Sequence, residues 1–341
     1  MNPAPRLAVQ LGGFVLRRLK PFAPPFRLWI DITSRCNLRC ALCAQPLLSD
    51  DQRRDMDMAL LASLAEQAPG LGCEINLFHR GEPLLRPDLG LWIRRFGAGG
   101  NLVRIHSNAT LLTPGRVADL LANPPDLFTC SLDTLDPKAY AAARRGADLD
   151  KALAGVEHLL AERARAGLHR PQVALLLMGR QAWGPEQESC LARLRELGLD
   201  RVIWRAAHNW GGALGAVSPR RRPAICTFPW YGLAVLSDGR VSPCPQDFFG
   251  QITLGRADRQ SLLEIWQGAK AQNLRRAHRS RRLGAYPVCL NCDRIQRPTL
   301  LGIPTQHLKN FLAESIVGPR RRPRAAGKVN RKQNLGNKPE N

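Results

Sequence analysis

The chain has 341 residues, 44% of them hydrophobic, which is enough for one large or two modest domains with a packed core. Its net charge of +22 invites a role in nucleic-acid binding, but 42 of the 50 basic residues are arginines spread over the whole chain, as a broad coding bias would produce. No stretch reaches the ~20 apolar residues of a membrane span and no secretory signal is evident, so we expect a cytoplasmic protein whose clustered cysteines bind metal rather than form disulfides.

Residues 1–25 form an amphipathic segment, with Leu7, Leu11 and Phe14 on one face of a predicted helix. Three prolines, at positions 21, 24 and 25, then end the helix. We expect this segment to pack on the outside of the neighbouring domain, and docking on a membrane surface is the alternative.

Strand-like and helix-like patterns alternate from Phe26 onward. The strand-like runs cover residues 27–33, 74–79, 102–107, 127–132, 172–178 and 201–205, and the helical patterns lie near residues 57–67, 87–96, 114–122, 150–164 and 186–197. Repeated strand–helix units predict a parallel sheet, and six units suit an α/β fold built as a partial (β/α)6 TIM-like barrel. In such barrels, the chemistry lies at the carboxyl ends of the strands.

Three cysteines follow the first strand directly. Cys36, Cys40 and Cys43 have the spacing C-x3-C-x2-C. Three thiolates would bind three corners of a [4Fe–4S] cube and leave one iron open to another ligand. Arg35 and Arg39 flank them with positive charge, which favours the ionised sulfur. A zinc knuckle with a distant fourth ligand and a ferredoxin-type cluster are the alternatives.

This stretch resembles the cluster motif of the radical S-adenosylmethionine (SAM) enzymes. The second strand ends in Gly81-Glu82-Pro83, which is similar to the Gly-Gly-Glu-Pro motif of that family, although Arg80 replaces the first glycine. The resemblance implies that Glu82 faces the methionyl ammonium of SAM, beside a glycine that lets the backbone approach. The alternative interpretation is that Gly81-Glu82-Pro83 forms an ordinary turn.

The next two strand ends also resemble family motifs. Ser107 and Asn108 stand in a stretch similar to Thr-Asn-Gly, with Ala109 in place of the glycine, and Ser131 and Asp133 belong to a Ser-Leu-Asp triplet. The resemblance implies that these residues contact SAM, with Ser131 near its ribose or carboxylate. Leu42 occupies a position that is often aromatic in the family, so we expect aliphatic packing against the adenine.

Other polar and sulfur side chains are assigned structural roles. His79 and His106 end strands on the same face and could touch substrate, but a lone histidine is more often a structural hydrogen-bonding group. Cys73, Cys130 and Cys190 stand singly, and we expect them to be small buried hydrophobic residues.

Four further cysteines lie beyond a lid or linker at residues 209–223. An Asp238-Gly239 pair predicts a hairpin that brings Cys226 and Cys244 together, a helix is expected over 261–276, and Cys289 and Cys292 follow. The arrangement resembles the SPASM or twitch auxiliary-cluster domain, and implies that Cys226, Cys244, Cys289 and Cys292 bind a second [4Fe–4S] cluster. A structural zinc ribbon has the same ligand count and remains the alternative.

Four regions are therefore predicted. They are the N-terminal segment at 1–25, a radical SAM partial barrel at 26–215, a small auxiliary-cluster domain at 216–300, and a basic, disordered tail at 301–341. No cysteine follows Cys292, so a second auxiliary cluster cannot be built. That places the chain among family members with one auxiliary cluster, which act on small polyols, sugars and some peptides.

The resemblance implies an enzyme that cleaves SAM reductively to a 5′-deoxyadenosyl radical and abstracts hydrogen from a substrate. We expect a two-electron oxidation, by dehydrogenation or bond formation, of a small polyol, sugar or natural-product intermediate, with a flavodoxin or ferredoxin as electron donor. A peptide-modifying maturase is the alternative within enzymes. A basic, zinc-holding RNA-binding protein is the alternative outside them, although an aromatic content of 6% offers few rings for stacking on bases.

Overall fold

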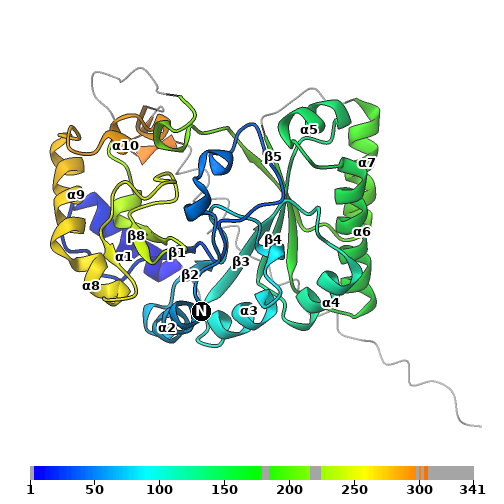
Figure 1. Ribbon diagram of the computed structural model, residues 1–341, viewed down its shortest axis with the longest axis horizontal. Helices are drawn as coiled ribbons and strands as arrows, with labels where there is room; N and C mark the ends of the chain where they lie inside the picture. The colour runs from blue at the N-terminus through cyan, green and yellow to red at the C-terminus, as the bar shows by residue number, and fades with distance from the viewer. Residues whose placement is uncertain (1–3, 179–183, 216–223, 297–298, 301–302, 306–341) are drawn as a thin grey trace, which may run out of the picture.

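The computed structural model describes residues 4–178, 184–215, 224–296, 299–300 and 303–305. Within these ranges, one sheet has the strand order β6-β5-β4-β3-β2-β1-β7-β8-β9 (Figure 1). The strands are β1 Arg27–Ile30, β2 Glu74–Asn76, β3 Leu102–Ser107, β4 Leu127–Asp133, β5 Gln172–Met178, β6 Arg201–Arg205, β7 Gly232–Val235, β8 Arg240–Ser242 and β9 Gly255–Arg256. Strands β1 to β6 are all parallel, which confirms the partial TIM-like barrel.

Helices flank this sheet at both ends. They are α1 Ala4–Val15, α2 Met58–Leu71, α3 Leu89–Gly97, α4 Pro114–Ala122, α5 Pro137–Ala143, α6 Leu149–Arg165, α7 Pro185–Glu196, α8 Leu262–Gln267, α9 Ala269–Ser280 and α10 Pro287–Leu290. Helices α6 and α7 lie beside the β4–β6 end and α8 and α9 beside the β7–β9 end (Figure 1). No helix within the described ranges has the length and apolar character needed to cross a membrane.

The barrel elements follow the sequence periodicities closely. Helix α6 buries the predicted stripe of Leu149, Leu153, Val156 and Leu160, and the Asp148 side chain caps it by accepting from the Lys151 amide. Strands β1 and β2 are shorter than predicted. The residues that follow them leave the sheet and form the loops at its carboxyl edge.

One predicted helix is wrong in its extent. The segment expected as a single helix over 261–276 forms two helices, α8 and α9, which separate at Gly268. Gly268 has an extended backbone, with φ −67° and ψ 164°, and a Cβ atom there would lie 2.9 Å from the carbonyl oxygen of Glu264. The glycine therefore permits a turn that a larger residue would resist. Helix α9 then continues to Ser280.

The barrel sheet runs on into the C-terminal part of the chain. Strand β7 pairs in parallel with β1, so that Leu28 faces Leu233 and Ile30 faces Val235, and β8 returns antiparallel through the predicted Asp238-Gly239 turn. Gly239 has φ +85°, which explains the glycine at that position. The regions that the sequence divides near residue 215 thus share one sheet and one hydrophobic core.

The N-terminal segment packs on this C-terminal part. Phe14 meets the Trp230 ring edge-to-face at 5.6 Å, and the Trp230 indole N–H donates to the carbonyl oxygen of Arg18 at 2.7 Å. Arg275 donates to the carbonyl oxygens of Leu19 and Pro229 at 2.9 and 2.8 Å. Helix α1 is therefore a fixed part of the fold rather than a detached segment.

Two predicted regions lie mainly outside the described residues. The Arg220–Arg222 part of the lid falls in the gap between residues 215 and 224, and nearly all of the basic tail lies beyond residue 305. Residues 303–304, which the sequence assigns to that tail, form β11 Ile303–Pro304, antiparallel to β10 Thr299–Leu300.

Candidate active site

A cavity of about 400 Å³ occupies the interior of the partial barrel. That volume lies within the usual range for small-molecule sites, ~300–1,000 Å³. The first three cysteines and all the predicted SAM contacts line this cavity; they are Cys36, Cys40, Cys43, Gly81, Glu82, Ser107, Asn108, Ser131 and Asp133. Loops that are far apart in the sequence therefore meet at one site, as parallel strands ending at one edge require.

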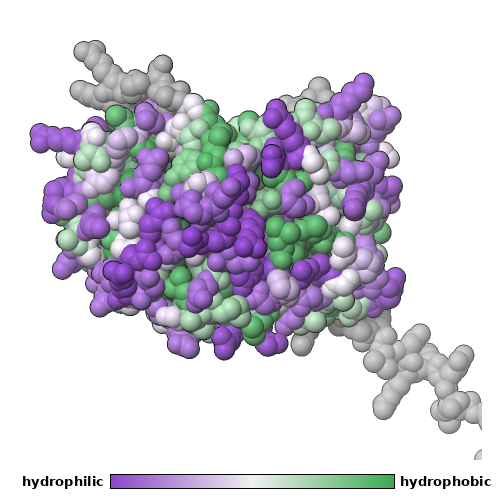
Figure 2. Space-filling model, viewed as in Figure 1, coloured by the Kyte–Doolittle hydropathy of each residue, from purple (hydrophilic) through white to green (hydrophobic). Residues whose placement is uncertain are grey.

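The cysteine loop is held by the turn that ends the second strand. The backbone N–H of Glu82 donates to the carbonyl oxygen of Arg35 at 2.8 Å. At Gly81, a Cβ atom would lie 2.3 Å from the carbonyl oxygens of both Thr33 and Arg35. Only glycine lets the two backbones approach this closely. The outer surface of this loop carries charged side chains, and hydrophilic residues gather over the middle of the face in Figure 2, where Figure 1 shows the loop between β1 and α2.

Burial dominates the chemistry of the three thiols. It raises the pKa of Cys36 to about 12 and that of Cys43 to about 11, and it also raises the pKa of Cys40. The opposing charge at Cys40 comes from Arg144, which hydrogen-bonds to the thiol. The sequence suggested Arg35 and Arg39 for this role, but Arg39 is exposed, and the Arg35 guanidinium is 61% exposed and pairs with Asp55 at 3.7 Å. Ligation by iron would release the thiol protons.

Glu82 organises the turns beside the cysteines. Its carboxylate is buried and accepts three hydrogen bonds, from the Leu84 N–H at 3.0 Å, the Ser107 hydroxyl at 2.8 Å and the Asn108 N–H at 2.8 Å. Burial raises the pKa of this carboxyl, and the three donors oppose the shift. The same side chain lines the cavity, so it can both fix the loops and face a cationic ligand.

Asn108 joins the third strand to the cysteine loop. Its amide group donates to the side-chain oxygen of Asn37 at 2.9 Å, and Asn37 in turn donates to the Thr110 hydroxyl at 2.9 Å. Ala109, which replaces the family's glycine, has φ +64°. The left-handed backbone that favours glycine is thus kept although the residue has changed.

Strand β4 ends in a bulge beside the cavity. The register with β5 shifts between Ser131 and Asp133, and Asp133 has φ +66°. The Asp133 carboxylate accepts a hydrogen bond from Arg144 Nε at 2.8 Å, so that the aspartate holds the arginine that faces Cys40. Sequence reasoning missed Arg144, which follows α5 and belongs to no motif.

The replacement of glycine by Arg80 also has a structural reason. Arg80 Nε donates to Asp31 Oδ2 at 2.7 Å, and its Nη2 donates to the Ser237 hydroxyl at 3.0 Å. Arg80 and Asp31 are both almost fully buried. This network connects the ends of β1, β2 and β7, and so holds the C-terminal part against the barrel.

Although position 42 itself is a leucine, an aromatic side chain lies near it. Trp210, in the short 3-10 helix η4 Trp210–Gly212, donates its indole N–H to the Leu42 carbonyl oxygen at 2.9 Å. Trp210 also lines the cavity and packs edge-to-face on Phe248, with ring centroids 4.9 Å apart. The described part of the segment that the sequence predicts as a lid or linker therefore contacts the cysteine loop through Trp210.

The four C-terminal cysteines form a second group. Cys226, Cys244, Cys289 and Cys292 influence one another electrostatically, and burial raises the pKa of Cys226 to about 12. They lie outside the cavity, but their neighbours Thr227, Gln246 and Arg294 line it. The residue before η4 contacts the chain between Cys289 and Cys292, because the Asn209 amide donates to the Asn291 carbonyl oxygen at 2.8 Å. Asn209 and Trp210 thus contact the two loops that carry the cysteine groups.

The three remaining cysteines are buried or partly buried, whereas two histidines predicted to be structural line the cavity. Cys73 and Cys130 are buried as predicted, and Cys190 is partly buried against the core. His79 and His106, which the sequence assigns to structural roles, both line the cavity. His106 stacks on Phe78 with ring centroids 4.0 Å apart, and His79 Nε2 contacts the Pro245 carbonyl oxygen at 3.0 Å.

Both cysteine groups suit iron–sulfur clusters. All ten cysteines are free thiols. Over the described residues, no group of three or more His, Cys, Asp or Glu side chains could hold a single metal ion as it stands. A cubane cluster differs from one ion in that each thiolate binds a different iron, so its cysteines stand further apart. The groups of three and four match an open and a closed cube, respectively.

Family comparisons agree with this chemistry. Residues 30–169 match the family model of the radical SAM superfamily, and residues 226–293 match that of the SPASM iron–sulfur cluster-binding domain. The matches imply [4Fe–4S] clusters and SAM as cofactors. They favour iron–sulfur ligation over the zinc alternatives.

Individual relatives are distant. A tungsten-containing aldehyde ferredoxin oxidoreductase cofactor-modifying protein of Pyrococcus furiosus is 24% identical over 318 residues, covering 78% of this chain and 86% of the relative. A PqqA peptide cyclase of Streptomyces rochei is 27% identical over 293 residues, which cover 73% of this chain and 77% of the cyclase.

Solved structures share the fold. BtrN in complex with AdoMet and 2-DOIA has a TM-score of 0.56 at 21% identity, covering 80% of this chain and 94% of BtrN. Streptococcus suis SuiB bound to the precursor peptide SuiA has a TM-score of 0.59 at 16% identity, and the match covers 77% of this chain and 69% of SuiB.

Proposed function

Because the chain is a radical SAM enzyme with a C-terminal SPASM domain, we propose that it abstracts hydrogen from a small-molecule substrate and completes a two-electron oxidation. When bound, the open cluster and SAM supply a 5′-deoxyadenosyl radical, which is the hydrogen-abstracting species. The protein binds and orients these groups. It also encloses the substrate and keeps water away from it.

One observation carries the proposal. The three thiols of Cys36, Cys40 and Cys43 share a cavity with the ends of β2, β3 and β4. We assign those thiols to the open cluster. We assign SAM to Gly81, Glu82, Ser107, Asn108, Ser131 and Asp133, with the Glu82 carboxylate placed to receive its ammonium group.

The second cysteine group supports an oxidation. A substrate alcohol that loses one hydrogen atom, one electron and one proton becomes a ketone. We assign the electron to a cluster held by Cys226, Cys244, Cys289 and Cys292, whose four thiolates would leave it no open iron for substrate. A substrate in the cavity would lie against Thr227, Gln246 and Arg294, each of which stands one or two residues from a cysteine of that group. A polyol, sugar or natural-product intermediate fits this reaction.

Peptide modification is the second candidate, and the similarity to PqqA peptide cyclases favours it. Gln10 and Phe14 of helix α1 and Trp230 also line the cavity, whose volume of about 400 Å³ favours a small substrate instead. In either case we expect a flavodoxin or ferredoxin as electron donor. Because clustered cysteines that bind iron belong where disulfides do not form, we also expect a reducing compartment such as the cytoplasm.

Anaerobic reconstitution tests the proposal. We expect about eight irons and matching sulfide per chain, and 5′-deoxyadenosine formation from SAM with a strong reductant. Replacing Cys36, Cys40 and Cys43 by Ala should halve the iron and abolish SAM cleavage, whereas Cys190→Ala, at a cysteine outside both groups, should change neither. A wild-type protein that binds only zinc would disprove the proposal.

A further inference from the structure

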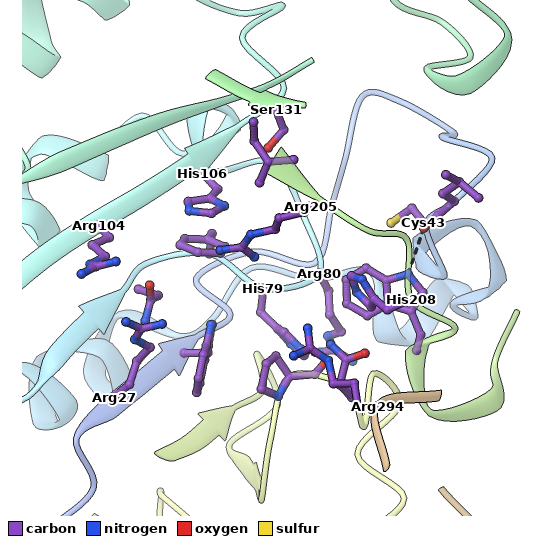
Figure 3. A pocket seen from close by; sticks show the side chains of 18 of the residues that line it. Arg27, Cys43, His79, Arg80, Arg104, His106, Ser131, Arg205, His208 and Arg294 are labelled. Carbon is purple, nitrogen blue, oxygen red and sulfur yellow. Dashed lines mark hydrogen bonds between the residues drawn. The ribbon is translucent and has the colours of Figure 1, made fainter. Parts of the chain in front are cut away.

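The cavity lining is rich in guanidinium groups. Six arginines line it, namely Arg27, Arg80, Arg104, Arg144, Arg205 and Arg294, whereas the carboxylates in the described lining are Glu82 and Asp133. In Figure 3, Arg27 and Arg104 lie on one side of the cavity, Cys43 lies on the other, and Arg205 and Arg294 reach in between them. An arrangement of this kind attracts anions, because charges that line a concave, partly enclosed site interact with a ligand more strongly than charges in bulk water do.

Two of these arginines serve the architecture already described. Arg144 is held by Asp133 beside Cys40, and Arg80 is held by Asp31 at the junction with the C-terminal part. These pairs neutralise the region around the cysteine loop.

We call the end of the cavity that Arg27 and Arg104 line its floor. One carboxylate, that of Glu74, serves two arginines, because Arg27 Nε donates to Oε2 at 2.7 Å and Arg104 Nη2 donates to Oε1 at 2.9 Å. Each arginine is only 9% exposed, and Glu74 is 4% exposed. This buried group of three therefore carries one formal positive charge.

These arginines lie far from the cysteines. Arg27 and Glu74 begin β1 and β2, whereas the cysteine loop and Glu82 follow the carboxyl ends of those strands. Arg104 stands four residues before Asn108 along β3, a distance of about 13 Å at the rise of a strand. The floor can therefore hold one end of a small molecule whose other end reaches the SAM contacts.

Aromatic rings also line the cavity, between this floor and the SAM contacts. The guanidinium of Arg27 lies 5.7 Å from the Trp29 ring centroid and 5.3 Å from that of Tyr231, and His106 stacks on Phe78 above Arg104 along the same strand. Apolar aliphatic side chains would fill a barrel of purely structural purpose. Arginines fixed among rings instead suit a substrate with an apolar or planar body and a charged end.

We propose that the substrate is a small organic anion, a carboxylate or a phosphate ester, whose charged group binds at Arg27, Arg104 and Arg205 while its reacting carbon faces the SAM contacts. Guanidinium groups bind both kinds of oxyanion through paired hydrogen bonds. This inference rests on the proposed function, and it replaces a neutral polyol by an acidic substrate class.

Calorimetric titration of the full-length, cluster-loaded protein with SAM tests the inference. The probes are benzoate, phenyl phosphate and the neutral benzyl alcohol. We expect at least one anion to bind ten-fold or more tightly than benzyl alcohol, with an affinity that falls as salt is added, and the tighter anion identifies the group as carboxylate or phosphate.

Variants locate the binding site. Arg104→Gln and, separately, Arg205→Gln should each weaken binding of that anion at least ten-fold, whereas the exposed Arg279→Gln should not change it. Arg205→Gln leaves the Arg27–Glu74–Arg104 group intact, which guards against a variant that fails to fold. Equal affinities for anions and alcohol, or wild-type affinity in both folded variants, would overturn the inference. Cleavage of SAM by the same wild-type samples shows whether the proposed function stands independently.

Discussion

Gly81 is the residue on which the cysteine loop depends most directly. A methyl group at this position would overlap the carbonyl oxygens of Thr33 and Arg35, just before Cys36. We expect Gly81→Ala to displace the loop and to reduce the iron content from about eight to about four per chain, with loss of SAM cleavage. Gly70→Ala is the matched control, since nothing lies within 4 Å of a Cβ atom there. Full iron in the Gly81 variant would show that the loop tolerates the shift.

Glu82 tests whether charge or shape is needed for SAM. Glu82→Gln keeps the length and one carbonyl acceptor of the side chain but removes its negative charge. We expect SAM affinity to fall roughly ten- to one-hundred-fold, corresponding to about 1.4–2.7 kcal/mol, while iron content is unchanged. Anaerobic equilibrium dialysis measures the affinity, and the exposed Glu66→Gln provides the control. Unchanged affinity would mean that Glu82 only shapes the turn.

Sequence patterns could reveal the motif residues but not all of the cavity. Cys36, Glu82 and Ser131 were predictable because fixed spacings and strand ends mark them. Arg104 also carried a signal, since it stands two residues before His106 and residues two apart on a strand point to the same side, yet the arginine-rich composition obscured it. The contact between Arg144 and Cys40 depends on how α5 packs, which no local pattern encodes.

At the scale of elements, α9 contains a buried histidine that responds to pH. His278 is 2% exposed, and neither ring nitrogen has a hydrogen-bond partner among the described residues. Burial lowers its pKa from 6.5 to about 4. The unfolded chain therefore binds this proton more readily than the folded one, so the histidine's contribution to stability is lost as the pH falls from 6.5 toward 4.

His278→Leu should remove that dependence. Between pH 7 and pH 5, wild type should lose about 2 kcal/mol more stability than the variant, because only wild type takes up the proton on unfolding. Urea unfolding of both proteins at the two pH values measures the difference. Parallel losses in the two proteins would show that other groups control acid stability.

Two features of how the elements join could not be predicted from the sequence: where α8 ends and which strand β7 pairs with. The break between α8 and α9 at Gly268 interrupts an apolar pattern that continues across it, so periodicity alone predicts one helix. The pairing of β7 with β1 was equally hidden. Local propensity identifies strands but not the neighbour each one finds.

At the scale of the whole molecule, the two cysteine groups should separate two steps of the reaction. We expect Cys289→Ala combined with Cys292→Ala to retain SAM cleavage but to stop product formation, because the substrate would lose its electron acceptor. Chromatography of 5′-deoxyadenosine and of product from the same reaction measures both steps, and circular dichroism checks the fold. Product formation by a folded variant would exclude the acceptor role, and joint loss of both activities with unfolding would indicate a structural one.

The place of β1 in the sheet has a consequence for how the protein is made. Its partner residues Arg27 and Gly232 are 205 positions apart. A ribosome needs about 10–40 s to cover that distance, and until then one edge of β1 has no neighbour. Unpaired apolar edges of this kind promote aggregation. A chain ended after residue 215 should therefore collect in the insoluble fraction on expression, whereas the full-length chain should not, and the protein should benefit from chaperones that shield the nascent barrel.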